Sequence, residues 1–127
     1  MKRILAGFLL SAALMAPGQA DAVSEEDFKV ENTRALLNLC TALPDDPMYS
    51  SAIHFCHGYL VGAFQYHVAA NWGPEGYSMV CFPHPVPTRD QAINAFIEWA
   101  KDHPEHMNEM PVETEFRFLA EKWPCQR

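Results

Sequence analysis

Residues 47–70 of this protein read PMYSSAIHFCHGYLVGAFQYHVAA and predict one long helix, the element that determines the fold class. Pro47 suits the first turn of a helix, where its missing N–H costs nothing, and the preceding Asp46 can cap that helix. Six residues recur at helical spacing and define the face expected to be buried: Ile53, Cys56, Leu60, Phe64, His67 and Val68. The histidines and the glutamine within the segment exclude a membrane-spanning helix.

Two glycines, Gly58 and Gly62, lie four residues apart inside this predicted helix. Because each glycine weakens a helix interior by about 1 kcal/mol, the pair indicates that another backbone approaches closely. We interpret the pair as close packing within the fold. The alternative is a homodimer seam, in which a second copy of the chain supplies the other backbone.

Three further segments predict helices around the long one. They cover residues 24–43, 88–103 and 111–123. The clearest start signal is a capping box, in which the side chains of Thr88 and Gln91 satisfy each other's backbone N–H groups. The stripes expected to be buried are Leu36, Leu39, Cys40 and Leu43 in the first segment, Ile93, Phe96, Ile97 and Ala100 in the second, and Val112, Phe116, Leu119 and Trp123 in the third. No segment predicts a strand, so we expect a compact all-α domain of four antiparallel helices.

Residues 71–88 form a long irregular segment between two of the predicted helices. Its helix-breaking residues are Gly73, Pro74, Gly76, Pro83, Pro85 and Pro87. A loop of this length in so small a domain is usually functional or tied down, and Cys81 can tie it down. Its aromatic residues either contact a partner or fold back to cover the core.

The chain begins with the pattern of a cleaved signal peptide: two basic residues, an apolar run over residues 4–16, and small residues at the positions that a signal peptidase inspects. The apolar run is too short to span a bilayer. We expect cleavage after Ala22, so that residues 1–22 are removed and residues 23–127 form one domain. The alternatives are cleavage after Ala20 and a retained membrane anchor.

All four cysteines follow the predicted signal peptide: Cys40, Cys56, Cys81 and Cys125. An even number in a small exported domain indicates two disulfides, and no C-x-x-C motif supports the competing zinc site. Among three connectivities we favour Cys40–Cys56, because the end of one helix faces the start of the next, together with Cys81–Cys125, which ties the loop to the C-terminus. The alternative is Cys40–Cys125 with Cys56–Cys81.

The sequence carries no recognisable enzyme motif: there is no G-x-S-x-G, no phosphate-binding glycine loop and no H-E-x-x-H. If the cysteines are paired, none remains as a nucleophile, so we expect no catalysis and no cofactor. Two histidine pairs, His54 with His57 and His103 with His106, could each offer two nitrogens to a metal, but no third ligand follows from spacing. A small metal-binding protein is therefore an alternative. The formal net charge of −7 argues against nucleic acid and anionic lipid as partners.

Several motifs together make this chain similar to a known family. They are Cys56-His57-Gly58-Tyr59 with Gly62, the Leu36–Cys40 end of the first helix, Cys81-Phe82-Pro83, the series Gln91, Phe96, Trp99 and His103-Pro104-Glu105, and the terminal Trp123-Pro124-Cys125. In order and spacing they resemble the Rap/Tai family of type VI secretion immunity proteins, over almost all of the chain that follows the signal peptide.

The resemblance implies a periplasmic, disulfide-containing helical protein, often a homodimer, that occludes a peptidoglycan amidase toxin injected by a neighbouring cell. In such a protein we expect the partner to be contacted by the loop, through Trp72, Glu75, Tyr77 and His84. Tryptophan and tyrosine are residue types that dominate interface energetics. The alternative function is a periplasmic stress or chaperone-like helical binding protein with no toxin partner, whose six histidines sense pH.

Overall fold

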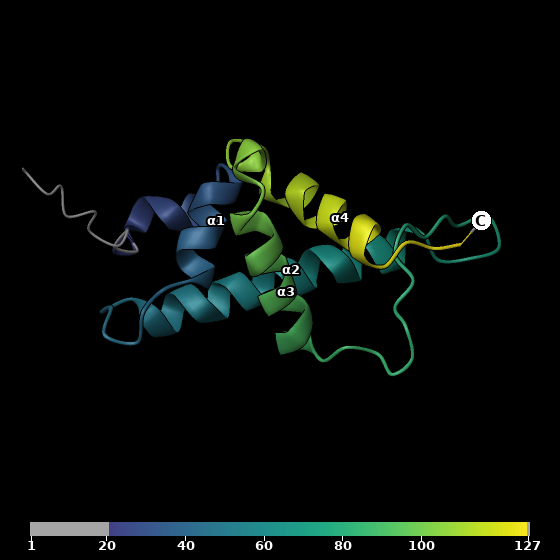
Figure 1. The fold of residues 1–127 in the computed structure, drawn as a ribbon, viewed down its shortest axis with the longest axis horizontal. Coiled ribbons are helices and arrows are strands. Elements are labelled where there is room, and N and C mark those ends of the chain that lie inside the picture. Colours follow the sequence, from purple (N-terminus) through teal and green to yellow (C-terminus); the bar gives the residue numbers. More distant parts are fainter. Residues whose placement is uncertain (1–20, 127) are drawn as a thin grey trace, which may run out of the picture.

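The computed structural model of the protein describes residues 21–126, so residues 1–20 of the predicted signal peptide lie outside it (Figure 1). The described chain forms four α-helices and two short 3₁₀-helices. In chain order they are η1 (Glu25–Lys29), α1 (Thr33–Cys40), α2 (Tyr49–Ala70), α3 (Arg89–Lys101), η2 (Pro104–His106) and α4 (Pro111–Lys122). Within residues 21–126 there is no strand beyond one isolated bridge, so the predicted all-α fold of four helices is confirmed.

Helix α2 runs along the long axis of the molecule, with α1 over its N-terminal half and the loop 71–88 at the opposite end (Figure 1). Helix α4 packs against α1, α2 and α3. The hydroxyls of Thr33 on α1 and Thr114 on α4 lie 2.7 Å apart in a buried hydrogen bond. The rings of Phe96 on α3 and Phe118 on α4 meet edge to face at 5.8 Å, and both are almost completely buried.

Both disulfides of the favoured connectivity are present, Cys40–Cys56 and Cys81–Cys125. The first joins the end of α1 to the first half of α2, as expected for two consecutive helices. The second joins the loop to the C-terminal segment. No cysteine is left free, so the alternative connectivity and the zinc interpretation are wrong.

The prediction of one continuous helix over residues 24–43 is wrong, because the helix is interrupted between η1 and α1. Val30 adopts a left-handed conformation with φ of 50°, and Asn32 then caps a new helix by accepting a hydrogen bond from the N–H of Ala35 at 3.0 Å. The helices η1 and α1 therefore each begin at a separate N-cap residue. As a consequence α1 ends at Cys40, and Leu43, predicted to be buried, is 52% exposed.

Helix α2 begins at Tyr49 rather than at Pro47, because Asp46 accepts a hydrogen bond from the backbone N–H of Met48 and closes a turn there. The interpretation of the two glycines as close packing within the fold is also wrong. Among residues 21–126, a Cβ atom added at Gly58 or at Gly62 would meet nothing within 4 Å beyond its own helix turn, and both residues are exposed. The glycine pair therefore lies on an open face of α2.

Helix α3 confirms its predicted start and its predicted face. The capping box of Thr88 and Gln91 is formed in both directions, at 2.9 and 3.2 Å. All four members of the stripe are buried: Ile93, Phe96, Ile97 and Ala100.

Helix α4 has the predicted position but not the predicted face. Its buried residues are Pro111, Thr114, Glu115, Phe118 and Leu119. The buried face of α4 therefore differs from the predicted stripe. Of the predicted members only Leu119 is buried, whereas Val112, Phe116 and Trp123 are half-buried. The observed face places a carboxylate, Glu115, in the interior.

Candidate functional site

The loop 71–88 is anchored to the C-terminal segment by two neighbouring contacts. One is the Cys81–Cys125 disulfide, and the other is a backbone bridge between Val80 and Pro124, which includes a 2.8 Å hydrogen bond from the N–H of Cys81 to the carbonyl of Trp123. Val80 itself is buried in the core. The middle of the loop is therefore held in one place.

One loop aromatic folds back onto the core. The ring of Phe82 lies 5.2 Å from Phe64 of α2 and 4.9 Å from Trp123, centroid to centroid. Phe82 therefore covers the core, which is one of the two alternatives stated for the loop aromatics. This contact adds a second, hydrophobic anchor beside the disulfide.

A glycine-dependent turn shapes the first part of the loop. Gly73 has φ of +111°, which side chains other than glycine rarely adopt, and the N–H of Gly76 donates to the carbonyl of Gly73 at 3.1 Å. A Cβ on Gly76 would lie 1.8 Å from the carbonyl oxygen of Asn71. Only glycine fits at that close approach, so the turn that carries Glu75 has a defined backbone shape.

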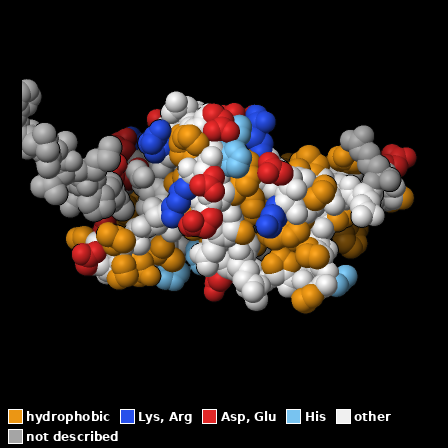
Figure 2. Space-filling view, viewed as in Figure 1, with side chains coloured by type: hydrophobic (Ala, Val, Ile, Leu, Met, Phe, Trp, Pro, Cys, Tyr) orange, Lys and Arg blue, Asp and Glu red, His pale blue; other side chains and the backbone are white. Residues whose placement is uncertain are grey.

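The four residues expected to contact a partner are all exposed at this end of the molecule. Trp72 is 85% exposed and Tyr77 is 58% exposed, and Glu75 and His84 are exposed as well. Other exposed apolar side chains occur in the loop and in the C-terminal half of α2: Tyr66, Val68, Met79 and Val86. Val68 was predicted to be buried, but it is 45% exposed. Figure 2 shows hydrophobic side chains gathered around the end where the loop lies. We refer to these apolar residues, with Trp72 and Tyr77, as the loop patch.

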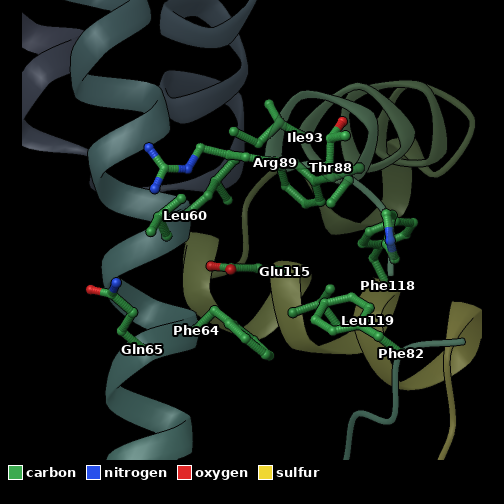
Figure 3. Close-up of a pocket in the computed structure, with 14 residues that line it drawn as sticks. Leu60, Phe64, Gln65, Phe82, Thr88, Arg89, Ile93, Glu115, Phe118 and Leu119 are labelled. Atoms are coloured by element: carbon green, nitrogen blue, oxygen red, sulfur yellow. The ribbon is translucent and has the colours of Figure 1, made fainter. Parts of the chain in front are cut away.

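A cavity of about 290 Å³ lies beside the loop, between α2, α3 and α4 (Figure 3). Its walls are mainly apolar and include Leu60, Phe64, Ile93, Phe118 and Leu119. Glu115 extends from α4 into this space toward α2 (Figure 3).

Glu115 is only 4% exposed, and its Oε2 atom has no hydrogen-bond partner among the described residues. Burial raises the pKa of Glu115 to about 8, because the charged carboxylate is poorly solvated in an apolar cavity. Burial, and secondarily the charge of Glu115, also raises the pKa of Tyr59 on α2. Near neutral pH the Glu115 side chain is therefore largely protonated.

Sequence reasoning missed Glu115, because the stripe predicted to be buried in residues 111–123 does not include it. One signal was available: Glu115 lies four residues after Pro111 and three before Phe118, in the row that α4 buries.

The two histidine pairs do not come together as a metal site. His54 Nδ1 lies 2.6 Å from the carbonyl of Ser50, and the ring of His103 stacks on Trp99 at 4.0 Å. No group of three or more potential metal ligands occurs among residues 21–126, and no helix in that range is long and apolar enough to cross a membrane.

The fold and the loop patch define a class of protein: a small, disulfide-linked helical domain with an exposed, anchored loop. The chain belongs to the family of Rap1a immunity proteins, whose family model matches residues 32–125. This match confirms the family that the motifs resemble. Comparison with curated proteins and with solved structures gave no significant match.

Proposed function

We propose that this protein is an exported immunity protein that acts in the periplasm. It binds a peptidoglycan amidase toxin delivered by type VI secretion and blocks the active site of that toxin with the loop 71–88. The protein itself hydrolyses nothing. Membership of the immunity family supports the role, and two disulfides are typical of an oxidising compartment.

The observation that carries the proposal is the loop patch on a restrained backbone. Apolar side chains gathered on an exposed surface mark interaction sites, and tryptophan and tyrosine are frequent hot spots. A disulfide, a backbone bridge and a glycine turn hold the loop before any partner arrives, so little conformational entropy is lost on binding. A cysteine amidase is expected to hold its cysteine and histidine in a cleft, which a protruding loop can fill.

Replacing Trp72 by alanine is expected to weaken binding to the toxin by about 2 kcal/mol, roughly 30-fold in Kd, because an exposed aromatic anchor is lost. The thermal midpoint should stay the same, since the side chain is 85% exposed and supports no core contact that would be lost. Calorimetric titration against the cysteine amidase toxin proposed as the partner measures the affinity.

The matched control is Leu43→Ala, which truncates a 52% exposed apolar side chain in the turn between α1 and α2, away from the loop. It should leave the affinity unchanged. A Trp72→Ala protein that melts earlier but binds as before would place Trp72 in the core and the binding surface elsewhere.

Export with cleavage after Ala22 is supported by the environment of the next residue. Val23 is buried, and its backbone nitrogen lies 2.9 Å from Oδ2 of Asp46. Cleavage would turn this N–H into an α-ammonium group, and the hydrogen bond to Asp46 would become charge-assisted and stronger.

The mass of the protein isolated from periplasm should therefore correspond to a chain that starts at Val23. Asp46→Asn should then lower the free energy of unfolding of this cleaved form by about 1 to 2 kcal/mol, and less in a form that keeps Asp21-Ala22. A full-length, membrane-bound species would contradict the proposal.

We also propose that two copies pair along the open face of α2 that carries Gly58 and Gly62. No neighbouring atom of the described chain lies within 4 Å of a Cβ added there, which leaves room for a second backbone. In sedimentation velocity, Gly62→Leu should abolish the dimer. The monomer should stay folded, because leucine favours a helix over glycine by up to about 1 kcal/mol. Glu113→Leu adds an exposed leucine on α4 as the control and should leave the dimer intact. A wild-type protein that sediments as a monomer at tens of micromolar would contradict the pairing.

A further inference from the structure

We propose that the cavity between α2, α3 and α4 is a binding site for an alkylammonium group, a primary amine on an unbranched aliphatic stem, with Glu115 as its anion. This site is separate from the loop patch and does not depend on a toxin partner.

The walls of the cavity fit the aliphatic stem. Leu60 and Phe64 line it from α2, Ile93 from α3, and Phe118 and Leu119 from α4. A volume of about 290 Å³ is at the lower end of the range for small-molecule sites, which suits a short chain rather than a fused ring system. Burying such a stem removes apolar surface from water and therefore favours binding.

Glu115 fits the ammonium group. It is the one carboxylate among the residues that line the cavity, it is 4% exposed, and its Oε2 atom has no hydrogen-bond partner in the described chain. A buried acceptor without a partner is unfavourable, and an ammonium group brings up to three N–H donors and a compensating charge. Figure 3 shows the carboxylate directed toward α2, in the space that the ligand would fill.

The other ionisable groups near Glu115 leave the space beside its carboxylate free for a cation. Arg89, from α3, also lines the cavity, is exposed, and forms no ion pair with Glu115 within residues 21–126. Tyr59 lies on α2 and is neutral near pH 7, because its pKa is raised above 10. His67, also on α2, packs its ring on Phe116, the neighbour of Glu115, at 4.9 Å. Solvent screens the exposed guanidinium of Arg89, so it opposes an ammonium only weakly.

The site should bind an amine more tightly as the pH rises. Since the pKa of Glu115 is about 8, the empty site holds a proton at pH 6, and an ammonium must displace it. Affinity should increase about tenfold from pH 6 to 7 and about tenfold again from pH 7 to 9, where the amine is still charged.

Calorimetric titration of the mature domain with hexylammonium chloride at pH 6, 7 and 9 tests this inference, with 1-hexanol as the uncharged probe of the same length. The expected result is a Kd for hexylammonium that falls about a hundredfold across the range and a Kd for hexanol that does not change with pH. In Glu115→Gln, hexylammonium should bind at least tenfold more weakly at pH 9 and without pH dependence. Retained hexanol binding in that variant shows that the cavity is intact.

The inference is overturned if hexylammonium binds no more tightly than hexanol at pH 9, or if Glu115→Gln leaves its affinity unchanged. A second arm uses Nα-acetyl-lysine methylamide in place of hexylammonium. If both amines bind with the Glu115-dependent pH profile, the site accepts a lysine side chain carried by a protein. If only hexylammonium does, the natural ligand is a free amine; either result supports an alkylammonium site.

Discussion

Replacing Glu115 by glutamine is expected to make the protein about 4 to 5 kcal/mol more stable at pH 9 while changing its stability little at pH 5. The cause is the apolar cavity, which raises the pKa of this carboxyl from 4.5 to about 8 in the folded protein. In the unfolded chain the same carboxyl is solvated and ionises near its ordinary pKa.

The direction in which stability changes with pH follows from the proton that the folded state retains. Below about pH 4.5 both states hold the proton, and the wild-type protein has its full stability. Between about pH 4.5 and 8 the folded state keeps the proton that the unfolded state has released, so wild-type stability falls as the pH rises. Above about pH 8 the loss is complete. Glutamine is neutral at every pH, so the variant does not lose this contribution.

Urea unfolding at pH 5, 7 and 9 measures the effect. Glu113→Gln is the matched control, because Glu113 is an exposed carboxylate on the same helix two residues away. That control should leave the pH dependence as in the wild type. If the free energies of unfolding of the wild type and of Glu115→Gln changed with pH in the same way, Glu115 would be solvated in the folded protein.

Removing the disulfide between Cys81 and Cys125 is expected to lower the free energy of unfolding by about 4 kcal/mol on the chain-entropy model, because the cross-link closes a long loop in the unfolded chain. The two cysteines are 44 residues apart, against 16 for Cys40 and Cys56. Cys81 is exposed, so replacing the pair by alanine leaves no core cavity to confound the result. The same change should weaken toxin binding, since it releases the middle of the loop.

Guanidinium unfolding of Cys81→Ala/Cys125→Ala measures this loss. Mild reductant offers an independent test on the wild-type chain, because Cys40 and Cys56 are buried and protected whereas Cys81 is exposed. Mass mapping should show Cys81–Cys125 reduced first. A loss below about 1 kcal/mol would mean that the bridge at Val80 and the packing of Phe82 alone hold the loop.

Sequence alone predicted those elements whose signals are local. Helix α3 has a reciprocal cap and one unambiguous apolar stripe, and both are confirmed. The break before α1 was missed, although Asn32 caps a second helix start inside the predicted segment 24–43. Proline at 47 suggested a helix start that Asp46 delays by closing a turn.

Features set by tertiary packing could not be read from the chain. Helix α4 carries two overlapping apolar rows, and only contact with α1 and α3 decides that Phe118, rather than Phe116, faces the core. The same choice buries Glu115. In the loop, Phe82 packs on Phe64 whereas Trp72 stays exposed, although both are aromatic residues in one irregular segment.

The most direct test of the central claim is the activity of the cysteine amidase toxin proposed as the partner, measured on muropeptides with increasing amounts of this protein. We predict that one molar equivalent abolishes cleavage, that Cys81→Ala/Cys125→Ala requires a clear excess, and that the protein alone cleaves nothing. Undiminished amidase activity in the presence of a tenfold excess of the wild-type protein would contradict the account.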